Sequence, residues 1–205
     1  MSKIKYFFQF LIVIIMFFIF KILGLRLSSY LGGKVFQIIG PFFRPKNLIH
    51  QNIRKVFPNI DEKKMNEIVS SMWDNYGRVF AEYVFIKKFR ITSLNSNIII
   101  EGIEILNEIK KNNQKVIFIS GHFSNFELMA MQLEKTGIKI AAIYRPLNNI
   151  FLNKIMERIR KKYICKNQIK KGIGGLKDLL KLNKVGYSTA LMIDQRVTEG
   201  SKINF

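Results

Sequence analysis

The sequence predicts an α/β protein with a mixed sheet flanked by helices, preceded by an N-terminal transmembrane helix. A nearly continuous apolar run over 6–25 predicts the membrane helix. Apolar runs rich in β-forming residues at 114–120, 138–144 and 187–194 are typical of buried strands in parallel sheets. Segments with helical spacing alternate with these runs, which indicates a parallel or mixed sheet.

The composition narrows the class of protein. The chain has 205 residues, of which 48% are apolar, so it is not a disordered protein. Its net charge of +20 favours an anionic membrane surface or an acidic partner, and the lack of basic, aromatic-rich RNA-binding motifs argues against nucleic acid. One cysteine rules out an intrachain disulfide, and with two histidines it makes a structural zinc site unexpected.

The apolar run is long enough to cross about 30 Å of hydrocarbon. Only Gln9 and Lys21 interrupt it, and no small-residue cleavage site follows, so we expect a retained anchor rather than a cleaved signal peptide. Positive flanking charge tends to stay in the cytoplasm. The C-terminal flank is the more basic, so we expect the rest of the chain on the cytoplasmic face.

We expect three regions: a membrane anchor over 1–25, a basic, amphipathic, membrane-proximal segment over 26–60, and the α/β domain over 61–205. The part from 24 to 45 is either a segment lying on the membrane or a plain linker. A helix within 47–60 should stop near Pro58, and its His50 should be a surface or packing histidine. Asp61 should cap a long helix over 62–89.

The remaining elements follow from the same patterns. Residues 97–102 are expected to form a short strand. Helices are expected over 103–113, 125–137, 150–163 and 174–186. Gly137 is a helix stop signal.

Polar residues follow each of the three buried strands, in "SGHFSNFE", "YRPLNN" and "DQR". Ligands in α/β sheets gather beyond the carboxyl ends of strands, so these segments predict a site. Ser124 to Glu127 form a capping-box pattern, which predicts a helix starting at Ser124 and leaves His122 in the preceding turn. Glu127 could then accept a hydrogen bond from the imidazole, as in a general base, and the helix N–H groups would favour an oxyanion. The alternative is an ordinary capped helix beside a buried histidine.

The segment "GHFSNFE" resembles the H-x4-D/E motif of the glycerolipid acyltransferase superfamily. The order of the blocks "NIRKVFPN", "EIKKNNQKVIFISGHFSNFE", "YRPLNN", "RIRKKY" and "LMIDQ" resembles the bacterial lipid A late acyltransferases, which add lauroyl or myristoyl chains to lipid A precursors. The resemblance covers nearly the whole chain after the apolar run.

The resemblance implies a glycerolipid-acyltransferase-like fold at the bacterial inner membrane. His122 would be the base and Glu127 its orienting carboxylate. Substrate would be bound by Arg160, Arg145, Asn125 and Asp194, with Arg158 close to the register of Arg160. No metal or cofactor is implied.

The implied donor is an acyl-acyl carrier protein thioester, and the implied acceptor is a hydroxyl on a 3-hydroxyacyl chain of a Kdo-bearing lipid A precursor. Members of this family continue beyond the point where "GSKINF" stands here, so we expect a fragment or a truncated product. Two alternatives stay open: acylation of a lysophospholipid or glycolipid, and a non-catalytic membrane-tethered relative.

Overall fold

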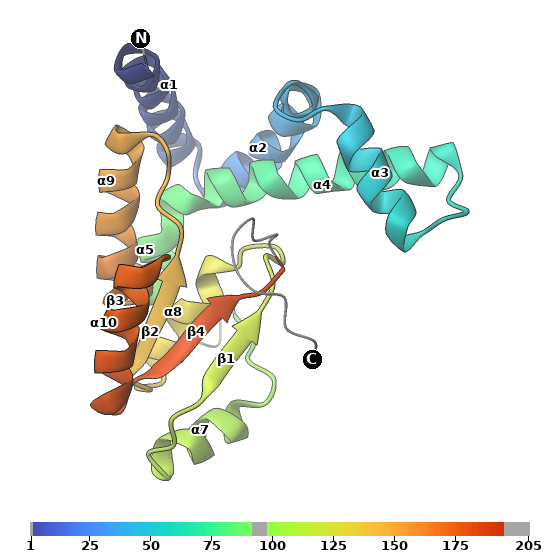
Figure 1. Ribbon diagram of the computed structural model, residues 1–205. Helices are drawn as coiled ribbons and strands as arrows, with labels where there is room; N and C mark the ends of the chain where they lie inside the picture. Colours follow the sequence, from blue (N-terminus) through green and yellow to red (C-terminus); the bar gives the residue numbers. More distant parts are fainter. Residues whose placement is uncertain (1, 92–97, 195–205) are drawn as a thin grey trace. The chain divides into compact units, whose positions relative to one another are not determined.

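The computed structural model describes residues 2–91 and 98–194 (Figure 1). The chain divides into two compact units, Met1–Lys88 and Phe89–Phe205, and each is described by itself. The long helix that begins at Glu62 belongs with the N-terminal helices.

The N-terminal unit is helical. In chain order its elements are α1 (Ser2–Leu23), α2 (Leu25–Ile39), the 3₁₀ turn η1 (Gly40–Phe42), α3 (Lys46–Val56), α4 (Glu62–Glu82) and the 3₁₀ turn η2 (Tyr83–Phe85), followed by α5 (Ile86–Ile91) at the boundary. Within α1, the segment Lys3–Leu23 is long and apolar enough to cross a membrane, and only 6% of its most apolar window is buried. This confirms the predicted apolar N-terminal helix as a candidate membrane span.

Helices α1 and α2 are joined by the single residue Gly24, whose φ of +77° favours glycine. The Ser28 hydroxyl donates to the Phe20 carbonyl at 2.6 Å and holds the turn. Helix α2 then packs on α4, where a side chain on Gly32 would strike the Gly77 carbonyl oxygen. The two helices approach closely because both positions lack a Cβ. The interpretation of 24–45 as a plain linker was therefore wrong, since 25–39 is a packed helix.

Phe80 of α4 is the aromatic centre of this unit. Its ring lies 5.2 Å from Phe17 and 6.2 Å from Phe20, both on α1, and 5.4 Å from Phe36 on α2. These aromatic contacts stabilise the packing of the three helices, because they remove apolar surface from water. The same helix starts where predicted, because the Asp61 carboxylate accepts the Lys64 N–H at 2.8 Å.

The end of α3 and the placement of its histidine also follow the prediction. Helix α3 ends at Val56, two residues before Pro58. His50 is buried, which agrees with a packing histidine.

The C-terminal unit alternates strands and helices. Its elements are α7 (Ile103–Lys111), β1 (Ile117–Ser120), α8 (Glu127–Lys135), β2 (Ile140–Tyr144), α9 (Ile150–Ile159), the π-helical turn η3 (Arg160–Ile164), β3 (Asn167–Lys170), α10 (Ile173–Lys184) and β4 (Ser188–Met192). The predicted α/β class is confirmed.

The four strands form a parallel sheet in the order β1-β4-β2-β3. Helices α8 and α10 cover opposite faces of it (Figure 1). Right-handed crossovers require this, because the connection from β1 to β2 moves along the sheet in one direction and the connection from β3 to β4 moves in the other. Strand β3 was not predicted, because its four residues, "NQIK", are mostly polar. The strand expected at 97–102 is absent from 98–102, and Asn97 lies outside the described residues.

Small side chains fill the middle of this sheet. Ala141, Ala142 and Ala190 are buried on neighbouring strands. The Cys165 thiol is fully buried beside them, donating to the Ile140 carbonyl at 3.4 Å, and burial raises its pKa to about 11. The thiol is therefore an inert core group in the folded protein.

Two adjacent glycines at the start of α10 give a matched test of the packing of α10 on the strands. A Cβ on Gly174 meets nothing within 4 Å, whereas a Cβ on Gly175 would overlap the Lys170 carbonyl oxygen of β3. We expect Gly174→Ala to raise the free energy of unfolding by about 0.5 kcal/mol. We expect Gly175→Ala to lower it by about 1–3 kcal/mol. Chemical denaturation of both variants checks this, and equal effects would contradict the packing.

Candidate active site

The register of β1 and β4 brings together two residues that lie far apart in the sequence. Ser120 pairs with Met192 in the parallel ladder, and the Ile193 N–H continues it by donating to the Ser120 carbonyl at 3.0 Å. His122 and Asp194 each follow two residues after that pair. Neighbouring parallel strands therefore deliver the two side chains to the same edge of the sheet.

Asp194 contacts His122 through both of its carboxylate oxygens. Oδ1 lies 2.7 Å from Nδ1 of the imidazole, and Oδ2 accepts the His122 backbone N–H at 2.7 Å. These bonds lower the pKa of Asp194, first through the backbone N–H and then through the ring. A carboxylate at Nδ1 favours the tautomer with its proton there and the lone pair on Nε2, which is the form of histidine that accepts a proton.

The turn that carries His122 is tight. A Cβ on Gly121 would come within 2.8 Å of the Phe123 ring and 3.3 Å of Asp194 Oδ2, so glycine leaves room for both groups beside the turn. Ser124 adopts a left-handed φ of +41°, which is uncommon outside glycine. The imidazole packs edge-on against the Phe126 ring, with centroids 4.6 Å apart. The backbone thus fixes both the place and the tilt of the imidazole.

The capping box predicted from Ser124 to Glu127 was wrong. Helix α8 begins at Glu127, and its N-cap, Phe126, makes no side-chain capping bond. The left-handed Ser124 is a turn residue rather than a cap. The first described N–H bonds of the helix go to local carbonyls: Leu128 donates to Asn125 and Met129 to Phe126.

Glu127 forms a buried ion pair with Arg160. Its Oε1 accepts from Nε at 2.9 Å and also from Nη2 of the guanidinium. The side chains are only 8% and 13% exposed. The pair joins the start of α8 to the π-helical turn, in which the Cys165 N–H reaches back five residues to the Arg160 carbonyl. The carboxylate on Nδ1 of His122 is therefore that of Asp194, and a role for Glu127 beside the imidazole stays a prediction.

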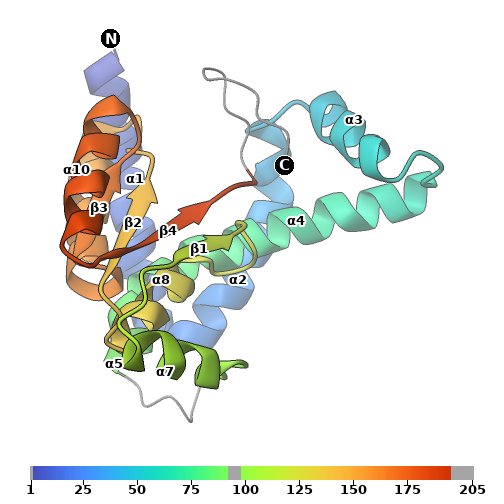
Figure 2. The same ribbon diagram turned by 60° about the horizontal axis from the view of Figure 1, so that its bottom comes forward.

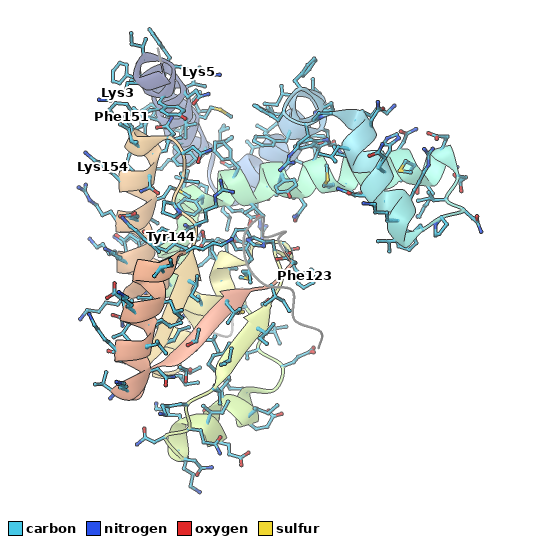
Figure 3. All side chains as sticks on the ribbon, viewed as in Figure 1. Lys3, Lys5, Phe123, Tyr144, Phe151 and Lys154 are labelled. Atoms are coloured by element: carbon cyan, nitrogen blue, oxygen red, sulfur yellow. The ribbon has the colours of Figure 1, made fainter. Side chains whose placement is uncertain are left out.

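Arg160 also rests on Tyr144, the last residue of β2, with the guanidinium carbon 5.6 Å from the ring centroid. The Tyr144 hydroxyl donates to Glu157 Oε1 at 2.6 Å. Burial raises the pKa of Tyr144, and the tyrosine hydroxyl lowers the pKa of Glu157. Glu157 thus holds the Tyr144 ring, and the ring packs against the Arg160 guanidinium. Figure 3 shows Tyr144 on the side of the sheet near α9 and α10, and Phe123 in the turn after β1.

The other predicted residues fall into different places. Arg145 follows β2 and is exposed, and β4 separates its strand from β1. Asn125 lies in the turn with His122, and its Oδ1 is buried. Arg158 is exposed, whereas Arg160 pairs with Glu127, and the substrate-binding role of Arg160 stays a prediction. Gln195 of the third polar segment lies outside the described residues.

The link from Asp194 to His122 was not expected from the sequence. Asp194 was predicted to bind substrate, and the only available signal was its place at the end of a buried strand. That position indicates a contact with His122 only once β4 is known to pair with β1. Glu157 of α9 was missed altogether, because its contact with Tyr144 depends on how α9 lies against β2.

A basic hollow of about 530 Å³ lies on α9 and the π-helical turn. Its lining is Lys154, Glu157, Arg158, Lys161 and Lys162. Glu157, the acidic member, is engaged by Tyr144, Asn153 and Lys170. Lys154 projects outward from α9 (Figure 3), so the hollow presents a net positive surface.

Replacing Asp194 with Asn tests the tautomer argument. The amide cannot accept both the backbone N–H and the Nδ1–H of His122, so one contact becomes unfavourable. We expect kcat of a reaction that uses His122 as its general base to fall by roughly 10²- to 10⁴-fold. The matched control, Asp178→Asn on the exposed face of α10, should leave it unchanged. An unaltered kcat in Asp194→Asn would contradict the role.

The same pair has a defined pH dependence. The pKa of Asp194 is lowered in the folded protein, so its contribution to stability is present above the unfolded pKa and is lost as the pH falls through the folded pKa. That loss therefore lies below the ordinary value of 3.8.

Comparison with known proteins was made on the whole chain. The sequence model of the family described as bacterial lipid A biosynthesis acyltransferase matches residues 1–205. The chain is 24% identical over 170 residues to the lipid A biosynthesis myristoyltransferase of Escherichia coli strain K12, which covers 83% of the chain and 50% of that protein. It is 24% identical over 147 residues to lipid A biosynthesis acyltransferase 2 of Shigella flexneri, covering 70% and 45%. The chain spans about half the length of the curated relatives it matches.

Proposed function

Because the chain belongs to the bacterial lipid A biosynthesis acyltransferase family, we propose that it transfers a fatty acyl chain from acyl-acyl carrier protein to a hydroxyl of a 3-hydroxyacyl chain on a Kdo-bearing lipid A precursor. The observation that carries this proposal is the contact between His122 Nδ1 and Asp194 Oδ1. A histidine oriented by a carboxylate at a sheet edge is a general base. An alcohol needs such a base before it can attack a thioester.

In the proposed reaction, Nε2 of His122 takes the proton of the acceptor hydroxyl as its oxygen attacks the thioester carbonyl. The new carbon–oxygen bond forms and the carbon–sulfur bond breaks. The proton on the imidazolium then passes to the departing thiolate of the carrier. Asp194 keeps its negative charge throughout and holds the ring in place.

We further propose that the reaction takes place at the bacterial inner membrane, with α1 as a single-pass anchor and the C-terminal unit on the cytoplasmic side. The apolar α1 and its basic C-terminal flank support this arrangement. The acceptor is an anionic lipid, so an anchored enzyme meets it at the bilayer surface.

The basic hollow on α9 and the π-helical turn fits the acidic carrier protein. Opposite charge across an interface speeds encounter more than it changes the chemical step. We expect Lys154→Glu/Arg158→Glu to raise KM for acyl-acyl carrier protein by about 10-fold with kcat unchanged. The control is Lys177→Glu/Lys181→Glu on α10, which changes the net charge equally. Equal KM values for the two double variants would show that the basic hollow does not bind the carrier protein.

The direct test of the proposed function is an in vitro assay with the protein in detergent micelles. Acyl-acyl carrier protein is offered with a Kdo-bearing lipid A precursor, a lysophospholipid or a glycolipid, and mass spectrometry reads the products. A secondary acyl chain on the lipid A precursor supports the proposal. Exclusive acylation of either other acceptor would reassign the substrate, and no transfer to any acceptor would favour a non-catalytic relative.

A further inference from the structure

Helix α2 and the turn after it carry an exposed apolar face. Its members are Leu27, Tyr30, Ile38, Phe42 and Phe43, which we call the α2–η1 face. The side chains of Phe42 and Ile38 are 87% and 72% exposed. Single exposed apolar side chains are ordinary on a protein surface, whereas several on one helix and its adjoining turn indicate an interaction site.

This exposed face is not the side of α2 that builds the core of its unit. The opposite side of the helix buries Ser28, Gly32 and Gly33 and packs on α4. Helix α2 therefore packs within its unit through small residues, and its larger apolar side chains lie on the other side. A helix whose apolar stripe faces outward is suited to a second apolar environment.

The charged residues of the segment that carries the α2–η1 face have one sign. Residues 1–60 contain nine lysines and arginines and no aspartate or glutamate. Arg26, Lys34, Arg44 and Lys46 are exposed beside the apolar residues. Exposed apolar side chains with cations beside them are characteristic of segments that lie in an anionic bilayer surface. The carboxylates that approach α2, Asp74 and Glu82 of α4, lie on its packed side, at Gly33 and Ser29. Two copies of this face would instead repel each other.

Helix α2 does not continue the direction of α1. The chain turns back at Gly24, and α2 runs away from α1 as it proceeds (Figures 1 and 2). The η1 turn follows at the end of α2 that is remote from Gly24.

We propose that the α2–η1 face is a second membrane contact, in which the apolar residues enter the boundary between headgroups and acyl chains and the flanking cations bind anionic headgroups. The depth for such a contact is roughly 5–10 Å. The α2–η1 face would fix the orientation of the N-terminal unit relative to the bilayer, because a single membrane-spanning helix can tilt and rotate. This inference does not depend on acyl transfer.

The test uses the full chain reconstituted in vesicles of phosphatidylethanolamine and phosphatidylglycerol. A thiol-reactive, environment-sensitive fluorophore is attached at Phe42→Cys or, as control, at the exposed Asn66→Cys on α4. The native Cys165 is fully buried and does not compete for the label. Lipids with brominated acyl chains quench a fluorophore that reaches the hydrocarbon.

We expect quenching at position 42 to be several-fold greater than at position 66, with a blue-shifted emission. Omitting phosphatidylglycerol, or introducing Arg44→Gln/Lys46→Gln, should reduce quenching at 42. The control Lys63→Gln/Lys177→Gln should not. Equal quenching at positions 42 and 66 would overturn the proposal. Disulfide cross-linking between two Phe42→Cys chains, without quenching, would assign the face to a second copy instead.

Discussion

His122→Ala is expected to lower the rate of the proposed acyl transfer by roughly 10²- to 10⁴-fold, the contribution of a positioned general base. Without the imidazole, the acceptor hydroxyl keeps its proton, and the Asp194 carboxylate loses the ring that it orients. The initial rate of product formation, measured by mass spectrometry of the acylated lipid, gives the effect.

Stability should be nearly untouched by this change, because the His122 side chain is partly exposed and packs mainly against Phe126. Circular dichroism and denaturation of the variant check that the fold is kept. Phe123→Ala is the matched control: it removes a neighbouring, exposed ring in the same turn and should retain activity. A His122→Ala rate within twofold of the wild type would exclude His122 as the base.

Breaking the Glu127–Arg160 pair is expected to destabilise the C-terminal unit strongly. Either Glu127→Ala or Arg160→Ala leaves one charge in a nearly closed site without its partner. Such a change costs about 3–5 kcal/mol. The apolar double variant Glu127→Leu/Arg160→Met should recover most of the loss, because no charge remains buried. The rate at which a thiol reagent reaches Cys165 reports the opening of this unit.

A second substitution at Glu127 distinguishes a structural role of this carboxylate from a catalytic one. Glu127→Gln keeps hydrogen-bonding capacity while removing the charge. If Glu127 acts only through Arg160, the loss should be in stability, with kcat and its pH profile retained in the folded fraction. A large loss of kcat with stability preserved would instead support the role beside His122 that the H-x4-E spacing predicts.

Much of the fold could be predicted from local patterns. The strands β1, β2 and β4 are apolar runs, α4 begins at a capping aspartate, and α1 is a continuous apolar helix; each pattern is complete within a few residues. The strand β3 escaped because "NQIK" lies at the edge of the sheet and is polar. The start of α8 was placed three residues early because a capping pattern is only a local preference. In the structure Ser124 is a left-handed turn residue, and the His122 backbone N–H is held by Asp194.

The candidate site was less predictable because its contacts are non-local. The sequence singled out His122, Glu127, Arg160 and Asp194, and the structure describes all four. Their pairing depends on strand order, which no spacing along the chain records. The structure joins His122 to Asp194 across 72 residues and Glu127 to Arg160 across 33.

The order β1-β4-β2-β3 also affects how the protein is made. Strand β4 is the last of the four to leave the ribosome, yet it occupies an interior place between β1 and β2. Until it arrives, the two earlier strands have an open slot between them, with hydrogen-bonding groups that a wrong partner can occupy. Those groups stay exposed until β4 inserts, and His122 cannot meet Asp194 before that event.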